Sequence, residues 1–518
     1  MRKPYNIFFC LSILIILAVV FLFPFHTQDG PNHKKDTLIL SRLDSSPMEA
    51  KVYRSGLGLF NTNTFFSLLY MPFKKFLSID VYEKCYIVFF LISLLIIFRL
   101  FLNTWSRVNT DLWPLFLPFL FHPLYLIGMY NFLASVSIAL LALILVYRGM
   151  ERKSWKYVLW FFLLCWLGQL AHPFTFIILS LVLGVQGFLS WKEDWKHFLP
   201  FVVIVVFFLL LGFMLPFFGS GMIVRTPYSF GVIPQLIGGL LVFNFMDYSV
   251  IHFILPLPFL IFLSVIAIKN VRTQGLRKNA LWLAALLFYF LFPRLGGGSA
   301  HANERFLPFI FLFFPLTLGQ FQSVWRNRIV VLSFVTFLMI SGGVVWGMFQ
   351  VQKEVKNAQV VLTYLPKISR LYPINFNLNG PSLINGDFYH TWADYENDRI
   401  VFSPYLFAFD KLTPLLRSIS SRETYFPALD QEYPRRMLID KCNSLWLDDT
   451  PHCELWREEA TSNIIKDAQY YDYWLVHEAP KDFWHKLQEV PGLKLIAQSG
   501  SFSLWHYQAA LPFNPPVP

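Results

Sequence analysis

Residues 85–102 read CYIVFFLISLLIIFRLFL, a run of eighteen residues with a single charge at Arg99. Eighteen residues of α-helix extend about 27 Å, close to the roughly 30 Å hydrocarbon thickness of a bilayer. The run can therefore cross a membrane as one helix. The rest of the chain agrees, because 55% of its 518 residues are hydrophobic and only 14% are charged. Soluble domains carry about a quarter charged residues, so the composition excludes a soluble globular enzyme and a disordered regulator.

Similar apolar runs recur along the first two thirds of the chain. They predict a polytopic α-helical membrane protein with about eleven transmembrane helices. The first run is longer than the apolar core of a signal peptide and no A-x-A cleavage site follows it, so we expect it to remain as a span. The predicted spans are 5–24, 85–102, 113–128, 131–147, 157–172, 174–190, 198–217, 250–268, 279–293, 306–322 and 329–349. Residues 232–246 are apolar enough to add a further span or a re-entrant segment.

The uneven distribution of charge predicts the topology. Residues 1–349 carry a net charge of +15 and residues 350–518 a net charge of −4, which together give the formal +11 of the chain. Basic residues of short loops accumulate on the cytoplasmic side of a membrane. A cytoplasmic N-terminus places most of the basic residues of 1–349 on that side, and an odd number of spans then places 350–518 outside. The charge thus indicates an integral protein of the inner or plasma membrane, and no nucleic-acid partner.

Two domains are therefore expected. Residues 1–349 form the transmembrane domain, whose first outer loop covers about 25–84, and residues 350–518 form an extracytoplasmic, periplasmic α/β domain. The elements predicted in the second domain are a helix at 463–469, a strand at 472–477, a helix at 483–487 and a hairpin of 493–497 with 502–506. Cys442 and Cys453 lie close together in this domain, and a disulfide between them is left open.

The first outer loop begins with an acidic motif. Residues 26–33 read His-Thr-Gln-Asp-Gly-Pro-Asn-His, so Asp29 lies just beyond the first span. Asp-Gly-Pro is typical of a turn, in which the aspartate binds backbone amides. The alternative is a catalytic general base that accepts the proton of a substrate hydroxyl, with a pKa raised by nearby apolar surface. His33 would then orient Asp29 or hold the substrate hydroxyl.

A second polar cluster is predicted between the ninth and tenth spans, where residues 293–306 read PRLGGGSAHANERF. Arginine donates two parallel hydrogen bonds to phosphate, and consecutive glycines let backbone amides approach an anion. The alternative is a structural ion pair of Glu304 with Arg294 or Arg305. We favour an anion site near the outer face. The residues assigned to it are Arg294, His301, Glu304 and Arg305, joined by Arg225 and by His172 at the end of the fifth span.

The predicted spans have no Asp or Glu near the membrane midplane. Coupled transporters and proton pumps usually need ionisable groups there, because such groups carry their ions or protons. Apolar stretches with flanking basic residues, such as 37–43 and 65–70, are typical of helices that lie in the membrane interface. The pattern favours chemistry on a lipid-linked substrate at the outer interface over transport.

The chain resembles the GT-C glycosyltransferases, integral membrane enzymes that use polyprenyl-phosphate-linked sugar donors. The resemblance rests on the predicted topology, the long first outer loop, the acidic residue after the first span and the outer C-terminal domain. Gln28-Asp29-Gly30-Pro31-x-His33 is similar to the start of this loop in a bacterial group with an Asp-Gly-Pro-x-His sequence. Gln28 stands where some members carry a second carboxylate, which leaves the use of a divalent metal open. No other cofactor and no metal-binding residue are expected.

The resemblance implies a hexosyl- or pentosyltransferase of cell-envelope glycan biosynthesis. Its partners would be a polyprenyl-phosphate-sugar donor, membrane lipids and a glycan, lipid or protein acceptor. Asp29 would take the proton of the acceptor hydroxyl in an inverting displacement, while Arg305 or Arg294 stabilises the phosphate leaving group. The alternatives are a ligase or polymerase of lipid-linked glycans, a transporter or flippase of lipid-linked substrates, and a non-catalytic scaffold with the same fold.

Overall fold

The computed structural model divides the chain into two compact units. The first, here called the helical unit, contains Met1–Phe25 and Leu57–Met348, and the second, the sheet unit, contains His26–Gly56 and Phe349–Pro518. The first part of the outer loop thus groups with the C-terminal residues, whereas the sequence analysis placed it with the transmembrane domain. The structure describes residues 3–27, 29–58, 61–105, 107–121, 123–126, 128–191, 194–214, 257–292, 303–318, 323–375, 400–403, 415–417, 462–479 and 481–508.

The helical unit is built from apolar helices, and the chain is a helical membrane protein. Among the described residues, three helices are long and apolar enough to cross a membrane, at Ile79–Trp105, Tyr130–Arg152 and Arg326–Leu362. Shorter apolar helices accompany them, and the total of eleven spans stays a prediction. The main helices are α1 (Lys3–Leu17), α4 (Phe65–Tyr70), α5 (Ile79–Trp105), α7 (Tyr130–Arg152), α8 (Trp155–Ala171), α9 (Phe174–Gln186), α10 (Trp195–Met214), α13 (Leu257–Leu291), α14 (Leu307–Thr317) and α15 (Ser323–Leu362).

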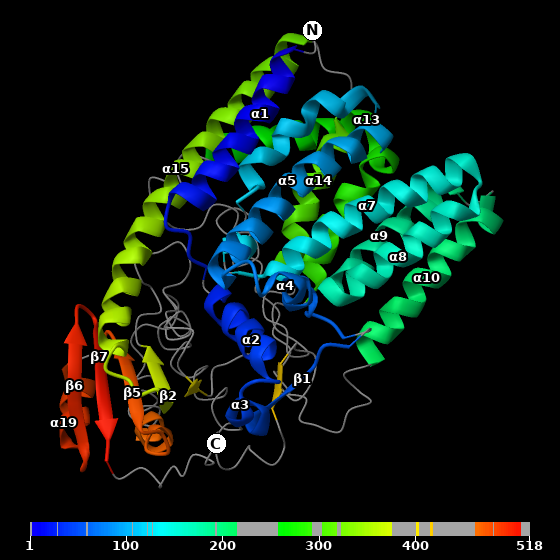
Figure 1. Ribbon diagram of the computed structural model, residues 1–518. Coiled ribbons are helices and arrows are strands. Elements are labelled where there is room, and N and C mark those ends of the chain that lie inside the picture. Colours follow the sequence, from blue (N-terminus) through cyan, green and yellow to red (C-terminus); the bar gives the residue numbers. More distant parts are fainter. Residues whose placement is uncertain are drawn as a thin grey trace. The chain divides into compact units, whose positions relative to one another are not determined.

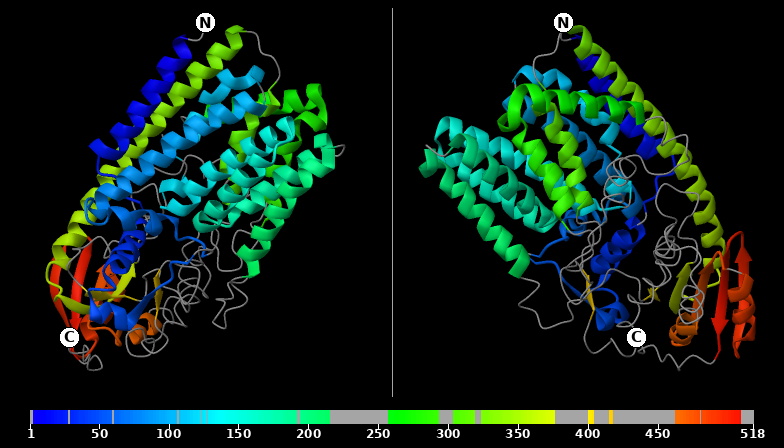
Figure 2. Two further views of the ribbon diagram at one scale, coloured as in Figure 1. Left: turned by 45° about the vertical axis from the view of Figure 1, so that its right-hand side comes forward. Right: turned by 180° about the vertical axis from the view of Figure 1, so that it is seen from behind.

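The helices pack closely through small residues and aromatic rings. α7, α8, α9 and α10 lie side by side in Figures 1 and 2 and contact one another. A Cβ atom on Gly149 of α7 would approach the Phe201 ring to 2.5 Å, so a larger residue there would require the ring to shift. The first helix, α1, lies along α15 (Figure 1), where the ring centroids of Phe8 and Phe334 are 4.8 Å apart. The beginning and the end of the helical unit are therefore packed together.

One predicted span is wrong. Residues 113–128 do not form an α-helix, because a 3₁₀ helix covers Arg107–Phe119 and only a four-residue α-helix, α6 (Pro123–Leu126), follows it. Pro114 and Pro118 lie inside the 3₁₀ helix. Proline has no backbone N–H and clashes with the preceding turn of an α-helix, so these residues break the α-helical pattern despite their apolar neighbours. His122, which follows them, lies outside the described residues.

Two helices are longer than the sequence predicted. α13 runs for 35 residues through 269–278, the basic segment expected to be a loop between two spans. This segment contains no proline and is rich in residues that favour helices, so hydropathy alone placed a break where the backbone continues. α15 likewise continues from the predicted span to Leu362, through a polar stretch of lysine, glutamate and glutamine.

The sheet unit contains a mixed five-stranded sheet in the described residues. Its strand order is β3-β2-β5-β7-β6, with β2 parallel to β3 and β5, and β7 antiparallel to β5 and β6. The strand at 473–477, the helix after it and the final hairpin confirm the elements predicted from the sequence. The elements are β2 (Ile368–Asn375), β3 (Ile400–Phe402), β5 (Tyr473–His477), α19 (Lys481–Glu489), β6 (Leu493–Ser499) and β7 (Phe502–Tyr507).

A buried aromatic core and the end of α15 hold this sheet. Trp474 and Tyr471 are fully buried with Phe483 and Leu487 of α19. The turn between β6 and β7 approaches α15 closely, since a Cβ on Gly500 would lie 2.3 Å from the side-chain nitrogen of Asn357. Gly500 also has a φ of +55°, a conformation that favours glycine.

The first part of the outer loop completes the sheet unit. It forms α2 (Gly30–Arg42), α3 (Pro47–Val52) and β1 (Tyr53–Ser55). β1 pairs in an antiparallel sense with β4 (Leu415–Arg417), and α2 packs against β4. The side chain of His26 also forms a hydrogen bond with Gln352 of α15. These contacts explain why the loop belongs to the same unit as residues more than 300 positions later.

Candidate active site

Asp29 lies at the start of α2. Its carbonyl oxygen accepts the backbone N–H of His33 at 3.1 Å, and Pro31 occupies the first turn, a position that suits proline because its missing N–H would have no helical partner. The half-buried Asp29 side chain makes no capping hydrogen bond to the helix. The Asp-Gly-Pro sequence therefore begins a helix, and its carboxylate is not used as the cap of that helix.

α2 carries buried charged residues that the sequence analysis did not assign to a site. Lys35 has only 2% of its surface exposed and Asp36 has none, and Lys34 is also buried. Burial, helped by the nearby Arg42, lowers the pKa of Lys35 to about 8, while Glu49 acts in the opposite direction. Burial also lowers the pKa of His33 to about 4, so this imidazole is neutral at neutral pH. Acidic and basic side chains are thus both buried along the helix that begins at Asp29.

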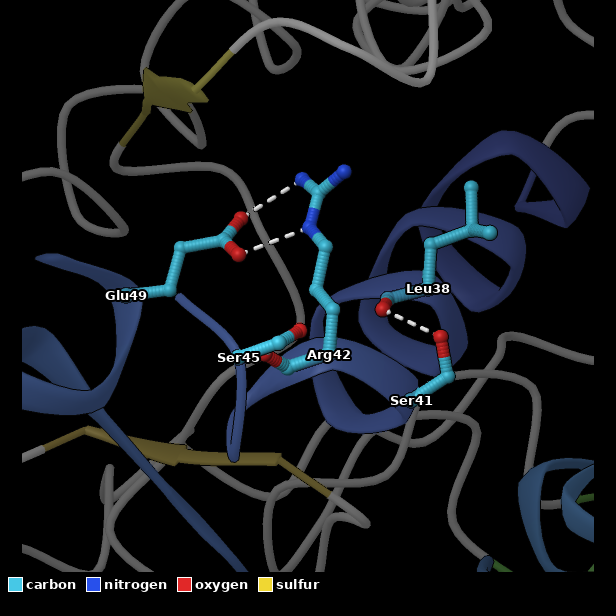
Figure 3. A network of polar contacts seen from close by, with 5 residues as sticks. All are labelled: Leu38, Ser41, Arg42, Ser45 and Glu49. Atoms are coloured by element: carbon cyan, nitrogen blue, oxygen red, sulfur yellow. Dashed lines mark hydrogen bonds and ion pairs between the residues drawn. The ribbon is translucent and has the colours of Figure 1, made fainter. Parts of the chain in front are cut away.

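An ion pair with two hydrogen bonds connects the end of α2 to α3 (Figure 3). Arg42 Nε donates to Glu49 Oε2 at 2.7 Å and Arg42 Nη2 donates to Glu49 Oε1 at 2.6 Å. Nearby, the hydroxyls of Ser41 and Ser45 donate to the carbonyl oxygens of Leu38 and Arg42. Paired N–H···O bonds of this kind fix both position and angle, so the pair sets the direction in which α2 runs.

Arg305 and His172, two of the residues predicted for the anion site, are in contact in the helical unit. Arg305 Nη1 lies 2.9 Å from His172 Nε2, and the backbone N–H of Phe174 points at His172 Nδ1 at 3.1 Å. Arginine can only donate, so both ring nitrogens of His172 face donors. A neutral imidazole can satisfy one of them and an imidazolium neither, so the geometry favours neutral His172.

Aromatic rings surround this contact. The Phe132 ring lies 5.9 Å from the guanidinium carbon of Arg305 and 5.9 Å from the His172 ring, which it meets edge-on. Phe174 packs against Phe306, the residue after Arg305, with a ring separation of 4.8 Å. A cation over an aromatic face is stabilised electrostatically, and the apolar surroundings strengthen any interaction of the guanidinium with an anion.

A network of neutral hydrogen bonds supports the same end of α7. Asn131 accepts the N–H of Phe66 at 2.9 Å and donates to the carbonyl of Asn63 at 2.8 Å. The Tyr130 hydroxyl donates to the buried carboxylate of Glu83. The sequence analysis did not assign Glu83 to a site, although a carboxylate beside an apolar run was a signal that could have found it. The bonds of Asn131 connect Asn63 and Phe66, at the start of α4, to the beginning of α7. The next residue of α7, Phe132, packs against His172.

The predicted site residues are divided between the units. Asp29 and His33 belong to the sheet unit, whereas His172, Glu304 and Arg305 belong to the helical unit. Arg225, Arg294, His301, Cys442 and Cys453 lie outside the described residues, as does Gln28. Within the part of the chain that the structure describes, no three His, Cys, Asp or Glu residues lie close enough together to hold a metal ion.

Comparison with known proteins identifies the fold. No protein-family model and no curated protein sequence matches the chain. The chain is similar to the crystal structure of ArnT from Cupriavidus metallidurans bound to undecaprenyl phosphate, with a TM-score of 0.54 and 10% sequence identity over 99% of this chain and 100% of that one. The apo state of the same protein matches with a TM-score of 0.53, again at 10% identity, over 99% of both chains. At this identity the likeness shows a shared fold along nearly the whole chain.

Proposed function

We propose that the chain is a GT-C-type glycosyltransferase that moves a sugar from a polyprenyl-phosphate carrier to an acceptor hydroxyl at the outer face of the membrane. The observation that carries the proposal is the fold, which resembles ArnT over 99% of this chain. In its crystal structure ArnT holds undecaprenyl phosphate, a lipid of the class expected here as the product carrier. The acidic start of α2 and the partly buried Arg305–His172 contact add groups suited to this chemistry.

In this proposal Asp29 is the general base of an inverting displacement. The carboxylate lies at the N-terminus of α2 and makes no capping hydrogen bond to that helix. It accepts the proton of the acceptor hydroxyl as the hydroxyl oxygen attacks the anomeric carbon. The bond from that carbon to the phosphate oxygen breaks, and the electron pair leaves with the phosphate. Neutral His33, one helical turn away, holds the acceptor hydroxyl in place.

The leaving phosphate gains negative charge as this bond breaks. Arg305 stabilises that charge best in the transition state, because a preorganised guanidinium needs no rearrangement when the charge develops. The contact with His172 positions the guanidinium, and the adjacent Glu304 carboxylate interacts with it electrostatically. We assign Arg294, His301, Glu304 and Arg225 to the same anion site, and the polyprenyl tail to the lipid-facing surface of the helices.

The test is a screen of donor lipids. The purified chain, reconstituted in liposomes, is incubated with polyprenyl-phosphate sugars and candidate glycan, lipid and protein acceptors. Mass spectrometry follows the release of polyprenyl phosphate and the appearance of the sugar on an acceptor. Release that requires the chain is expected. Movement of the intact lipid-linked sugar across a bilayer, without cleavage of the bond, would indicate a transporter and contradict the proposal.

The same assay tests Arg305. The Arg305→Ala variant should raise the donor KM or lower kcat by about 10- to 100-fold, because a charge-assisted contact to the phosphate is lost. Arg305→Lys should recover part of this loss, since it keeps the charge but not the planar fork. The control is Arg148→Ala, which removes an arginine already paired with Glu151 on the surface of α7. Unchanged donor kinetics in Arg305→Ala would exclude a phosphate role for this residue.

A further inference from the structure

The turn between α4 and α5 exposes two aromatic and two basic side chains in succession. Phe73, Lys74, Lys75 and Phe76 are all exposed, and Phe76 has 82% of its surface accessible. Phenylalanine is usually buried, so two exposed rings on either side of a lysine pair are an unusual surface for a folded chain. We call these four residues the aromatic–lysine turn.

The aromatic–lysine turn is held rigidly from behind. The backbone N–H groups of Phe76 and Leu77 donate to the carbonyl of Phe73 at 2.8 and 3.0 Å, and the Tyr70 hydroxyl donates to the carbonyl of Leu77 at 3.3 Å. The Tyr70 ring packs on Tyr82 with a centroid separation of 5.0 Å. These contacts hold the backbone of the turn, and the rings of Phe73 and Phe76 are exposed in the structure.

The turn also continues a lipid-facing stripe. α5 begins at Ile79 and is one of the helices long and apolar enough to cross a membrane. Its exposed apolar side chains recur at helical spacing along one face, so this face meets lipid in a membrane protein. The exposed residues of the stripe are Val81, Cys85, Phe89, Ile96 and Leu100. Val81 brings the stripe to within five residues of Phe76, and the charged Asp80, Glu83 and Lys84 lie in the same stretch of the chain.

We propose that the aromatic–lysine turn docks in the headgroup layer and binds acidic phospholipid headgroups. Phe73 and Phe76 insert at the boundary with the acyl chains, and the ammonium groups of Lys74 and Lys75 contact the lipid phosphates. The exposed Asp80 offsets one of these charges, so the turn keeps a net positive charge. The partner is therefore an anionic lipid surface. This inference is independent of sugar transfer, and it assigns a role to residues that the proposed function does not use.

Native mass spectrometry of the full chain tests this directly. Detergent-solubilised protein is titrated with phosphatidylglycerol, which is anionic, or with phosphatidylcholine, which is neutral overall. A basic residue near an anionic surface strengthens binding by about five-fold, so Lys74→Gln/Lys75→Gln should lower the affinity for phosphatidylglycerol by about thirty-fold. Its affinity for phosphatidylcholine should not change. The control is Lys481→Gln/Lys494→Gln, which removes two exposed lysines from the sheet unit and should change neither affinity.

Two further variants separate charge from shape. Lys74→Arg/Lys75→Arg keeps both charges and should retain the preference for phosphatidylglycerol. Phe73→Ser/Phe76→Ser removes the inserted rings and should weaken the binding of both lipids. The proposal is wrong if the glutamine variant binds phosphatidylglycerol as tightly as the wild type does. This is also the result expected if the turn binds a protein and not a lipid. The proposal is equally wrong if the glutamine variant loses affinity for both lipids to the same extent.

Discussion

The helical unit and the sheet unit satisfy their buried polar groups in different ways. In the helical unit, Asn131 bonds the backbone of Asn63 and Phe66, and the Tyr82 hydroxyl donates to the carbonyl of Phe66 at 2.6 Å. In the sheet unit, two arginine–carboxylate pairs, each with one buried and one partly exposed member, are joined by two hydrogen bonds each. Arg42 pairs with Glu49 in this way, and Arg370 pairs with Asp472.

This difference follows from the cost of moving charge out of water. A charged side chain in lipid loses its hydration and is not compensated by water, which costs free energy. Neutral hydrogen bonds therefore dominate where helices face a bilayer. Among the described residues of the helical unit, the charged side chains held away from the surface include Glu83, bonded by Tyr130, and Arg305, in contact with His172. The first contact lies at the beginning of α7, where Tyr130 is the first residue. The second lies next to it, since Phe132 of α7 packs against both His172 and Arg305. These two contacts of charged side chains with polar partners thus lie near the start of α7, whereas ion pairs such as Arg148–Glu151 and Lys153–Asp194 are exposed.

Breaking the Arg42–Glu49 pair should have the largest effect on stability. Glu49→Gln leaves the Arg42 guanidinium with a neutral partner, and the loss of one member of a buried pair costs about 3 to 5 kcal/mol. We expect about 3 kcal/mol, at the lower end, because the Arg42 side chain is 23% exposed and still reaches water. The measurement is the free energy of unfolding in denaturant titrations of the detergent-solubilised chain.

The matched control is an exposed ion pair of the helical unit. Arg148 and Glu151 are 3.0 Å apart with side-chain exposures of 31% and 42%. Glu151→Gln should cost less than about 1 kcal/mol, because water screens and replaces the interaction. If Glu49→Gln and Glu151→Gln lower the free energy of unfolding by the same amount, the Arg42–Glu49 pair contributes no more to stability than the exposed pair does.

The buried Lys35 should make stability depend on pH. Its pKa is about 8 in the folded chain and 10.5 when unperturbed, so the unfolded chain binds more protons between these values. The free energy of unfolding should therefore rise with pH through this window, by about 3 kcal/mol in total, and the penalty of the buried charge is fully present below pH 8.

Two substitutions isolate this contribution. Lys35→Met removes the titrating group, so its unfolding free energy should exceed that of the wild type most at neutral pH, and the difference should shrink as the pH rises to about 10.5. Lys35→Arg keeps a charge at every pH tested and should lack the stabilisation at high pH. Parallel pH profiles of wild type and Lys35→Met would mean that Lys35 titrates normally and is accessible to water.

The neutral network of the helical unit should give a smaller effect. Asn131→Ala leaves the N–H of Phe66 and the carbonyl of Asn63 without this partner, which should cost about 2 kcal/mol of unfolding free energy. Ser137 lies on the same helix, and its buried hydroxyl has no hydrogen-bond partner among the described residues. Ser137→Ala should therefore be nearly neutral. A larger cost for Ser137→Ala than for Asn131→Ala would contradict the importance of the Asn131 contacts.

Hydropathy predicted the elements whose cause is local. The uninterrupted apolar run at 85–102 lies within α5, and the strand predicted at 472–477 contains β5. The failures have equally local causes, since Pro114 and Pro118 break an apolar stretch and the basic residues of α13 do not break a helix. The charge at 269–278 suggested a loop between two spans. Whether a helix continues, however, depends on residues that restrict or break the helical backbone, such as proline, more than on hydropathy.

The site was harder to predict because it depends on tertiary contacts. The contact of Arg305 with His172 joins residues 133 positions apart, and sequence could only place both near one face of the membrane. The pairing of β1 with β4 joins residues about 360 positions apart, and it makes the outer loop part of the sheet unit. Burial of Lys35 and Asp36 follows from this packing. A run of charged residues after the first span gave no sign that they would be shielded from water.

The central claim is tested most directly by the activity of Asp29→Asn. The variant keeps the size and the helix start, so the chain should be expressed and folded as the wild type is. It cannot accept the acceptor's proton, and loss of a general base lowers a rate by about 10²- to 10⁴-fold. Sugar transfer from polyprenyl-phosphate donors should fall by this factor, while Asp44→Asn, which changes an exposed carboxylate of the same outer segment, should keep full activity. Full transfer by Asp29→Asn would contradict the account.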